Sequence, residues 1–142
     1  MIESLFLSFL LITKKPLFTE IDNKTYIVKG FVKSYTGNQI DIHKKKPFVN
    51  KAYKLLFVEG VYKHYGSNNF EINNLNSEYK IIKTNFNGEF DVYLTQGLYT
   101  IFILKGDKAY LNNFDGLGNY SYIEVKDNIE NIIIRDVRNA YF

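Results

Sequence analysis

The chain has 142 residues, a length that suits one domain with a sizeable core. Hydrophobic residues make up 46% of it and charged residues 23%, which excludes an intrinsically disordered chain. The net charge of +3 is too small to indicate a nucleic-acid-binding protein, and the absence of cysteine excludes disulfides, cysteine-based zinc sites and thiol catalysis. Tyr and Phe contribute 12 residues each, and this aromatic enrichment favours strands.

Residues 1–24 are expected to be a separate N-terminal segment with one apolar run at 5–12. This run is too short to cross a bilayer as a helix, which needs about 20 residues. It suits the apolar part of a signal peptide or an anchor, which predicts a periplasmic, outer-membrane-associated or secreted protein. Glu3 before the run and the lack of a small-residue cleavage site after it favour the alternative, a cytoplasmic protein whose first segment packs on the core. Any membrane association is expected through this segment only.

Residues 25–142 are expected to form one domain made of strands. Strands are predicted at 25–35, at 52–65 with a kink at Gly60, and at 78–83. Gly30 interrupts the first of them and predicts a β-bulge or the close approach of a neighbouring strand. The segment 36–51, which carries a run of lysines after His43, and the Asn-rich segment 66–77 are predicted loops.

The stretch 84–104 is the clearest pattern in the chain. Asn87-Gly88 predicts a tight turn, because both residues tolerate positive φ. A strand follows in which the apolar residues alternate with polar ones, and after Gly97 a second strand resumes the alternation. The inward positions are predicted to be Phe90, Val92 and Leu94 in the first strand, and Tyr99, Ile101 and Ile103 in the second.

The remaining chain continues the rhythm of short strands and turns. Strands are expected at 108–112, 120–125 and 131–137, with turns at 106–107 and 113–119. The total of seven to eight short strands, without an amphipathic helix, predicts an all-β Greek-key β-sandwich.

One local motif supports the sandwich. Leu94-Thr95-Gln96-Gly97-Leu98-Tyr99 has the Leu-x-x-Gly-x-Tyr form of a tyrosine corner. In this motif the tyrosine hydroxyl bonds to upstream backbone and pins an arch between two sheets. The alternative is an ordinary tight turn followed by a core aromatic residue.

The stretch Lys83–Ile103 resembles the core signature of carboxypeptidase regulatory-like domains, which are transthyretin-like, or prealbumin-type, β-sandwiches. The family pattern is a Thr, an Asp/Asn-x-x-Gly turn, an aromatic residue, an alternating strand, Pro-Gly-x-Tyr and a second alternating strand. Gln96 stands where the family usually has Pro. Residues 28–32 resemble the family's first strand, and residues 109–119, 123–125 and 140–142 resemble small single-domain bacterial envelope members.

This resemblance implies a prealbumin-type fold without a shared activity. The domain is a non-catalytic accessory in its parent enzymes, so the resemblance implies a binding module that contacts a glycan, a peptide or another envelope protein. Nothing in the resemblance implies a cofactor.

The sequence nominates no catalytic, cofactor-binding or metal-binding residue. His43 and His64 lie in separate segments, so we expect both at the surface rather than in one iron site. Oxygen ligands for calcium are conceivable among the residues of 112–119, but Asp115 is the only carboxylate there, which favours a plain Asx- and Gly-rich turn. The carboxylates at Asp41, Asp107 and Glu124 have no evident partner for acid–base catalysis.

The aromatic excess and the loops are the remaining candidates for function. Most rings are expected in the core, whereas some could face outward and stack on sugar rings or form a protein interface; examples are Tyr62, Tyr65, Phe70, Tyr93 and Tyr122. The alternative, which the pattern favours, is packing of neighbouring aromatic rings across strands. We therefore expect a non-catalytic module of the cell envelope or exterior with an unknown protein or glycan partner. The alternatives are a structural protein that self-assembles through its sheet edges and, less favoured, an enzyme.

Overall fold

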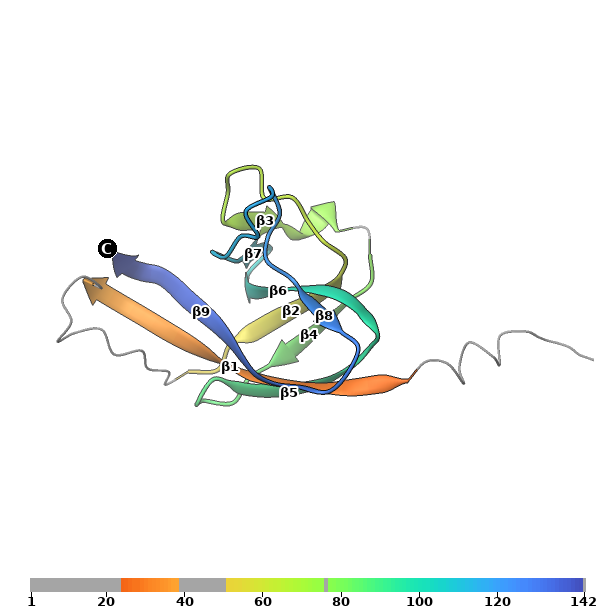
Figure 1. Ribbon diagram of the computed structural model, residues 1–142. Coiled ribbons are helices and arrows are strands. Elements are labelled where there is room, and N and C mark those ends of the chain that lie inside the picture. Colours follow the sequence, from red (N-terminus) through yellow and green to blue (C-terminus); the bar gives the residue numbers. More distant parts are fainter. Residues whose placement is uncertain (1–23, 39–50, 76, 142) are drawn as a thin grey trace, which may run out of the picture.

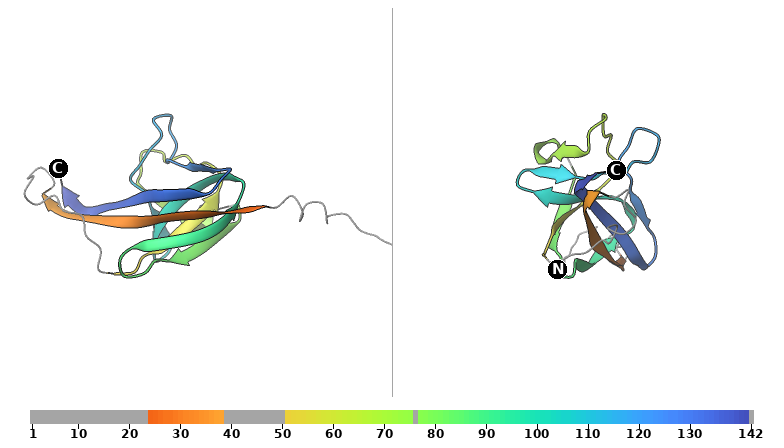
Figure 2. Two further views of the ribbon diagram at one scale, coloured as in Figure 1. Left: turned by 60° about the horizontal axis from the view of Figure 1, so that its bottom comes forward. Right: turned by 90° about the vertical axis from the view of Figure 1, so that its left-hand side faces the viewer.

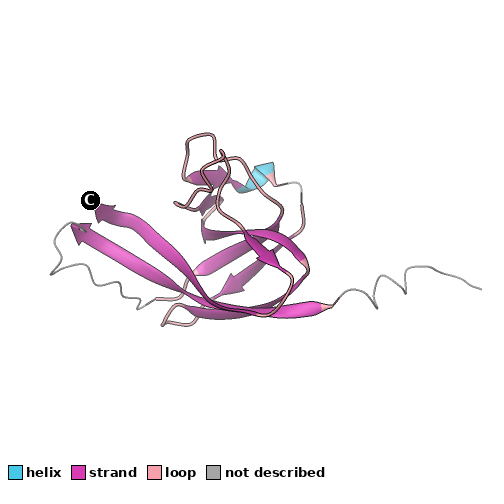
Figure 3. Cartoon of the chain, in the orientation of Figure 1, coloured by secondary structure: helices cyan, strands magenta, loops and turns pink. Residues whose placement is uncertain are grey.

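The computed structural model describes residues 24–38, 51–75 and 77–141 (Figure 1). These residues form nine strands and one short 3-10 helix, and no α-helix occurs among them (Figure 3). The elements are β1 (Thr25–Asn38), β2 (Lys54–Glu59), β3 (Asn69–Glu71), η2 (Ile72–Asn74), β4 (Tyr79–Lys83), β5 (Glu89–Thr95), β6 (Gly97–Lys105), β7 (Lys108–Tyr110), β8 (Ile123–Val125) and β9 (Ile129–Tyr141).

The strands form two sheets that pack together as a β-sandwich (Figures 1 and 2). The smaller sheet has the order β5-β1-β9, and the larger sheet has the order β3-β7-β6-β2-β4, with β8 also paired to β6. Strand β1 is antiparallel to β5 and parallel to β9. The all-β sandwich that the sequence predicts is confirmed, while its Greek-key and prealbumin-type connectivity stays a prediction.

Strands β1 and β9 are long and lie side by side past the ends of the other strands (Figures 1 and 2). Their register shifts between Val28↔Ile129 and Gly30↔Ile132, so β9 carries an extra residue at this point, and Asn131 there has a φ of 65°. A Cβ atom on Gly30 would lie 2.8 Å from the Cβ of Ile132 and would collide with its carbonyl oxygen. The bulge or close approach predicted at Gly30 is confirmed, because both occur.

The main hydrophobic core lies between the two sheets. Alternate residues of β5 and β6 face it as the sequence predicts, and β1, β2 and β9 supply most of the other side chains. The most deeply buried members are Val28, Val32, Leu55, Phe57, Ile103 and Val125.

A second, smaller core covers the outer face of the larger sheet. Strands β2 and β6 are buried on both faces, so Leu56 and Phe102 point away from the main core and into this second one. Val58 of β2 and Ala109 of β7 belong to the same core. The segments around 61–75 and 111–120 cover it with further apolar side chains, which are Tyr62, Phe70, Leu75, Leu111 and Tyr120. The alternation in 98–104 predicted one buried face, formed by Tyr99, Ile101 and Ile103. The intervening Phe102 is apolar because the other face of β6 is buried as well.

The turn before β5 is organised by Asn85. The Asn85 Oδ1 atom accepts hydrogen bonds from the amides of Asn87 and Glu89, both at 2.9 Å. The amide of Gly88 donates to the Asn85 carbonyl oxygen at 2.9 Å, with Gly88 at a φ of 79°. The turn predicted at Asn87-Gly88 is confirmed.

The tyrosine corner is also confirmed. The hydroxyl of Tyr99 donates to the Thr95 carbonyl oxygen at 3.0 Å and lies 3.0 Å from the Thr95 hydroxyl. Gly97 makes the turn between β5 and β6 with a φ of 156°. Because the Tyr99 hydroxyl reaches the Thr95 carbonyl oxygen, the corner forms with Gln96 in place of Pro.

Three expected segments differ from the structure. The predicted strand 52–65 ends at Glu59, because Gly60 adopts a φ of 115° and only an isolated bridge, Lys63↔Asn119, follows. The predicted loop 66–77 contains β3 and η2, because residues 69–71 pair with β7, which comes much later in the chain. The predicted loop 36–51 begins inside β1, which continues to Asn38.

The strands at the end of the chain also have different bounds from those expected. Strand β7 ends at Tyr110 and β8 begins only at Ile123, whereas β9 is longer at both ends than 131–137. The total of nine exceeds the predicted seven to eight. The predictions for the N-terminal segment 1–24 and for the lysine run after His43 lie outside the described residues, apart from Lys24.

Within the described ranges, no helix has the length and apolar character needed to cross a membrane.

Candidate functional site

The most distinctive surface feature of the sandwich is the outer edge of β9. Strands β9 and β5 are the two edges of the smaller sheet. At the β5 edge, the Lys80 ammonium group donates to the Tyr93 carbonyl oxygen at 3.0 Å. In the larger sheet, β3 and β8 have only three residues each, and β4 carries Lys80 and Lys83. Short strands and lysines are the usual protection of sheet edges against pairing with another chain. Strand β9 has neither of these two protections, since it is 13 residues long and contains no lysine; its own irregularities are the bulge beside Gly30 and the charge of Arg135.

A groove runs along this edge of β9. Its other wall is the segment 111–123, which connects β7 to β8, and its base is β6. Strand β6 pairs with β7 at Ile103–Lys105 and with β8 at Gly97–Tyr99, so residues 100–102 have no strand partner on this side among the described residues. The groove therefore lies beside residues 100–102 of β6 in the larger sheet and along the β9 edge of the smaller sheet.

The groove has an apolar base and a polar rim. It encloses about 350 Å³, which is within the range of ligand-binding pockets. The apolar lining is Tyr99, Ile101, Leu111, Tyr122, Ile123, Ile132, Ile133, Ile134 and Val137, and the polar lining is Asn112, Asn113, Ser121 and Arg135. The Ile133 side chain is 48% exposed, although it lies in the middle of the strand. Such a surface suits an extended apolar ligand that also carries hydrogen-bonding groups.

A buried polar network holds β9 next to one end of the groove. The Asp136 side chain is only 2% exposed and accepts hydrogen bonds from Arg138 Nε and Nη2, both at 2.8 Å. The Tyr53 hydroxyl donates to Asp136 Oδ2 at 3.0 Å, and the Arg138 guanidinium lies over the ring of Tyr110 at 5.2 Å. Because a carboxylate with several charge-assisted donors has few alternative positions, this network fixes β9 against Tyr53, which directly precedes β2, and against β7.

The network shifts the acidity of its members. Burial alone would raise the pKa of Asp136, but the hydrogen bonds and the charge of Arg138 outweigh it and lower the pKa below its ordinary value. Burial raises the pKa of Tyr53 and of Tyr110, and the Asp136 charge raises both further. The bonds to Asp136 raise the pKa of Arg138. The network is therefore an ion pair with two neutral phenols at neutral pH, which is a structural arrangement rather than an acid–base pair.

The candidate residues from the sequence fall outside the groove for the most part. His64 is half-buried, its Nδ1 atom accepts a hydrogen bond from the Gly66 amide at 2.7 Å, and its ring lies 4.4 Å from that of Phe114. His43 and Asp41 lie outside the described residues, so the expected separation of the two histidines stays a prediction. Within the described part of the chain, no three His, Asp or Glu side chains are grouped to hold a metal ion.

The Asx-type turn expected at 113–119 is confirmed. Asp115 Oδ1 accepts hydrogen bonds from the amides of Leu117 at 2.7 Å and Asn119 at 3.0 Å. Asp115 Oδ2 accepts a third from the Asn119 side chain at 3.0 Å, and these bonds, that of the Asn119 side chain first, lower the pKa of Asp115. The loop itself therefore uses both oxygens of this carboxylate.

The five aromatic residues expected to face outward divide into two groups. Tyr65, Tyr93 and Tyr122 are exposed, as predicted, and Tyr122 lines the groove. Tyr62 and Phe70 are only partly exposed, because they pack edge to face with each other at 5.3 Å over the second core. For these two residues the structure favours the alternative, packing between neighbouring aromatic rings, which occurs because the outer face of the larger sheet carries a core of its own.

Sequence reasoning missed the groove and the Asp136 network. The available signal for the groove was the uncharged run Ile132-Ile133-Ile134, which is longer than a strand with one solvent-exposed face requires. Nothing in the sequence indicated that Tyr53 would meet Asp136, which is 83 residues further along.

Comparisons of the chain with protein-family models, with curated proteins and with solved structures found no match. The resemblance to carboxypeptidase regulatory-like domains therefore stays a prediction from the sequence.

Proposed function

We propose that the protein is a non-catalytic binding module that captures an extended segment of a partner protein along β9. The observation that carries this proposal is the long edge of β9 without lysines beside a groove with an apolar base. An added strand would satisfy the backbone groups at the edge, while its alternate side chains would enter the groove. This mode of recognition needs no catalytic residue and no cofactor.

The chemistry of the groove favours a peptide over a glycan at this site. Its base is formed mainly by isoleucines and other apolar residues of the main core, which offer little to sugar hydroxyl groups. The amide side chains of Asn112 and Asn113 and the hydroxyl of Ser121 lie at the rim, where they can bond the polar backbone of a peptide. A peptide with apolar residues at alternate positions is the ligand expected.

The test is selection of peptides followed by a matched pair of variants. A phage-displayed library of random linear peptides is selected on the protein, and the affinity of an enriched peptide is measured by calorimetry. Ile133→Lys places a charge on the β9 edge and is expected to weaken binding about tenfold or more, a loss of about 1.4 kcal/mol. Ile81→Lys is the control, because Ile81 lies on the edge strand β4 and is 50% exposed, close to the 48% of Ile133.

Two results would contradict the proposal: no enriched peptide, or an enriched peptide whose affinity both variants leave unchanged. Backbone N-methylation of the peptide gives a second readout, because loss of the amide donors should abolish binding only if a strand is added to the sheet. A protein that bound the peptide equally well after N-methylation would not recognise it in this way.

Self-association is the second candidate function. The uncharged run Ile132–Ile134 offers the same edge to β9 of another copy, which would join two small sheets into one. Sedimentation at increasing concentration separates the candidates, since a dimer that Ile133→Lys dissociates supports self-association. A stable monomer excludes it and leaves the peptide as the ligand of the edge.

We also propose that the protein belongs to the cell envelope or exterior. The apolar run at 5–12 and the resemblance to small envelope members of the carboxypeptidase regulatory-like domains support this location. Fractionation of cells that produce the full chain tests it, and recovery of the intact chain with Met1 in the cytoplasm would contradict it.

A further inference from the structure

A second hollow lies on the outer face of the larger sheet, away from β9. It is bounded by the segment 61–74 and by Tyr120 and encloses about 600 Å³. Its lining consists of Val61, Tyr62, Lys63, His64, Tyr65, Ser67, Asn69, Phe70, Glu71, Asn74 and Tyr120. None of these residues lines the groove beside β9. The hollow is therefore a separate candidate for binding.

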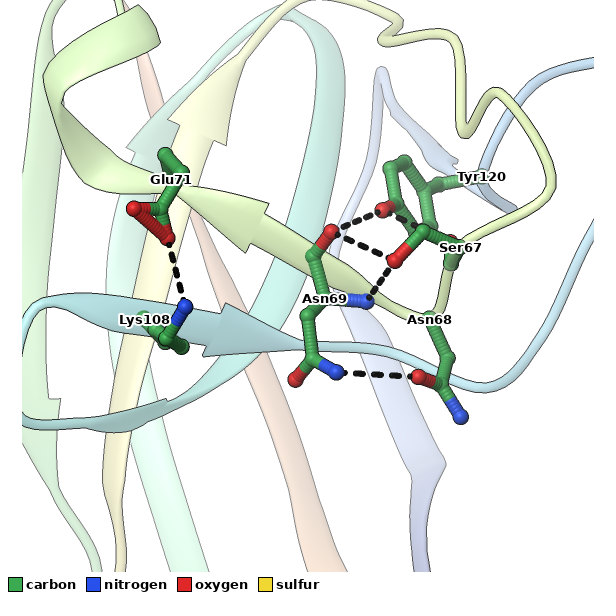
Figure 4. A network of polar contacts seen from close by, with 6 residues as sticks. All are labelled: Ser67, Asn68, Asn69, Glu71, Lys108 and Tyr120. Atoms are coloured by element: carbon green, nitrogen blue, oxygen red, sulfur yellow. Dashed lines mark hydrogen bonds and ion pairs between the residues drawn. The ribbon is translucent and has the colours of Figure 1, made fainter.

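The walls of the hollow are held in place by hydrogen bonds between distant segments. The Tyr120 hydroxyl is bonded to the carbonyl oxygens of Ser67 at 2.9 Å and Asn69 at 3.1 Å (Figure 4). The Tyr120 amide donates to the Tyr62 carbonyl oxygen at 2.8 Å, and the His64 amide donates to the Gly118 carbonyl oxygen at 3.1 Å. Because these bonds join the segment 61–69 to the segment 118–120, the hollow is formed before any ligand arrives.

Polar side chains on β3 are fixed at one side of the hollow. Asn69 Nδ2 donates to Asn68 Oδ1 at 3.1 Å, and Glu71 is paired with Lys108 at 3.1 Å (Figure 4). The Ser67 hydroxyl both accepts from the Asn69 amide at 3.0 Å and donates to the Asn69 carbonyl oxygen at 3.1 Å. These bonds take the hydroxyl hydrogen of Ser67 and one N–H of Asn69, so the groups that Asn69 can offer a ligand are its Oδ1 atom and its second N–H, both held in a fixed orientation.

Tyr65 presents its ring beside these polar groups. The side chain is 87% exposed, the largest exposed fraction among the large hydrophobic residues that the structure describes. Its backbone φ is 51°, a left-handed conformation that is uncommon for a residue with a side chain. The turn holds this conformation through the bond from the Gly66 amide to the His64 ring at 2.7 Å. The Ser67 amide also donates to the His64 carbonyl oxygen at 2.9 Å, so Tyr65 and Gly66 are the two central residues of a tight turn that displays the ring to solvent.

We propose that this hollow binds a neutral oligosaccharide of equatorially substituted pyranose rings. Such a sugar has a C–H face that packs on an aromatic ring, here Tyr65, and equatorial hydroxyl groups that bond carboxamides, here Asn69 and Asn74. Lys63 and Glu71 are the Lys and Glu residues that line the hollow, and Glu71 is paired with Lys108. The single lysine is too little positive charge to indicate an acidic sugar as the ligand. A lipid surface does not fit, because it would desolvate Lys63 and the two carboxamides without replacing their hydrogen bonds.

The test uses cellohexaose, laminarihexaose and chitohexaose as probes, titrated into the isotopically labelled protein and followed by NMR. At least one probe is expected to bind with a millimolar or lower dissociation constant and to shift the signals of Tyr65, Asn69 and Asn74. Tyr65→Ala should weaken that binding about tenfold or more. Tyr65→Phe should retain it, because the ring face remains.

Leu117→Ala is the matched control. Leu117 is 84% exposed at the tip of the neighbouring loop, close to the 87% of Tyr65, but it does not line the hollow. The control should bind the sugar as the wild type does, and so should Ile133→Lys, which alters the separate groove beside β9. The proposal of a sugar site in the hollow and the proposal of a peptide site in the groove are thus tested independently of each other.

Three outcomes would overturn the proposal: none of the probes binds, the shifted signals lie elsewhere on the molecule, or Tyr65→Ala leaves the affinity unchanged. Binding of a selected peptide instead of the sugars at Tyr65 would assign the hollow to a protein partner and would equally overturn it.

Discussion

At the scale of single residues, hydrogen bonds of buried or partly buried side chains fix the positions where strands change direction. Tyr99 closes the corner between β5 and β6 through one hydroxyl, and Thr100 reaches across from β6 to the Gly60 carbonyl oxygen at 2.8 Å. The Thr84 hydroxyl accepts from the Tyr53 amide at 2.8 Å and so joins the turn after β4 to the start of β2. Each of these bonds satisfies a group that water does not reach freely.

We expect Tyr99→Phe to lower the free energy of unfolding by about 1 kcal/mol, because the change removes the hydroxyl that bonds the Thr95 carbonyl oxygen. Chemical denaturation monitored by fluorescence measures this loss. Tyr93→Phe is the control, since the Tyr93 side chain is exposed on the preceding strand. If both variants kept the stability of the wild type, the corner would contribute nothing to it.

Asp136 should make the stability depend on pH. Its pKa in the folded protein lies below the ordinary value of about 3.9, so its contribution is complete above that value and is lost as pH falls through the folded pKa. We expect Asp136→Asn to cost about 2–3 kcal/mol at neutral pH, because Arg138 then lacks its carboxylate partner.

Urea unfolding at several pH values measures this effect. The difference in stability between the wild type and Asp136→Asn should shrink as the pH falls below about 4, since the wild type then loses the charge as well. A difference that stayed constant down to the acid limit of the folded protein would show that the ion pair is not the cause.

At the scale of elements, the pairing of β1 with β9 includes a bulge in β9. The sequence indicates it only through Gly30 on β1. Gly30 lies against the Ile132 backbone, and the extra residue in β9 bends that strand beside the groove. Further along β9, the network of Asp136 and Arg138 holds the strand in place. The part of β9 that lines the groove is therefore positioned by the bulge at one end and by this network at the other.

We expect Gly30→Ala to lower the free energy of unfolding by about 2 kcal/mol, because the new methyl group collides with the Ile132 carbonyl oxygen. Thermal and urea unfolding measure the loss, and peptide binding should weaken along with it as β9 shifts. The neighbouring Lys29→Ala, at an exposed position, should change the stability by no more than about 0.5 kcal/mol. Equal stability of the two variants would mean that β9 adapts to the methyl group without cost.

At the scale of the whole molecule, the sandwich holds two separate surfaces. The groove runs between the 111–123 segment and the outer edge of β9, which pairs with no other strand of the described residues. The hollow lies over the second core on the outer face of the larger sheet. Both use the connection between β7 and β8, which lines the groove at residues 111–113 and 121–123 and the hollow at Tyr120. One irregular segment therefore contributes to both candidate sites, as expected of loops placed by a rigid sheet.

Much of the fold could be read from local patterns. The alternation in β5, the turn at Asn87-Gly88, the corner at Tyr99 and the close approach at Gly30 each depend on residues that are neighbours in the sequence or on a single residue type. Local backbone preferences and the two-residue period of a strand are sufficient to predict such features. The all-β class follows from them together with the aromatic and β-branched composition.

The sequence by itself thus determined the fold class, the turns on either side of β5 and the lack of an evident catalytic motif, but not that β5 and β6 lie in different sheets. Only the tertiary structure decided which strands lie at the edges of the sheets, which strands are buried on both faces and which loops lie next to each other. The contact of Tyr120 with Ser67 spans 53 residues, and that of Tyr53 with Asp136 spans 83. Periodicity along one strand carries no information about its partner, because pairing depends on how the whole chain buries its apolar surface, and both candidate sites arise from such long-range pairings.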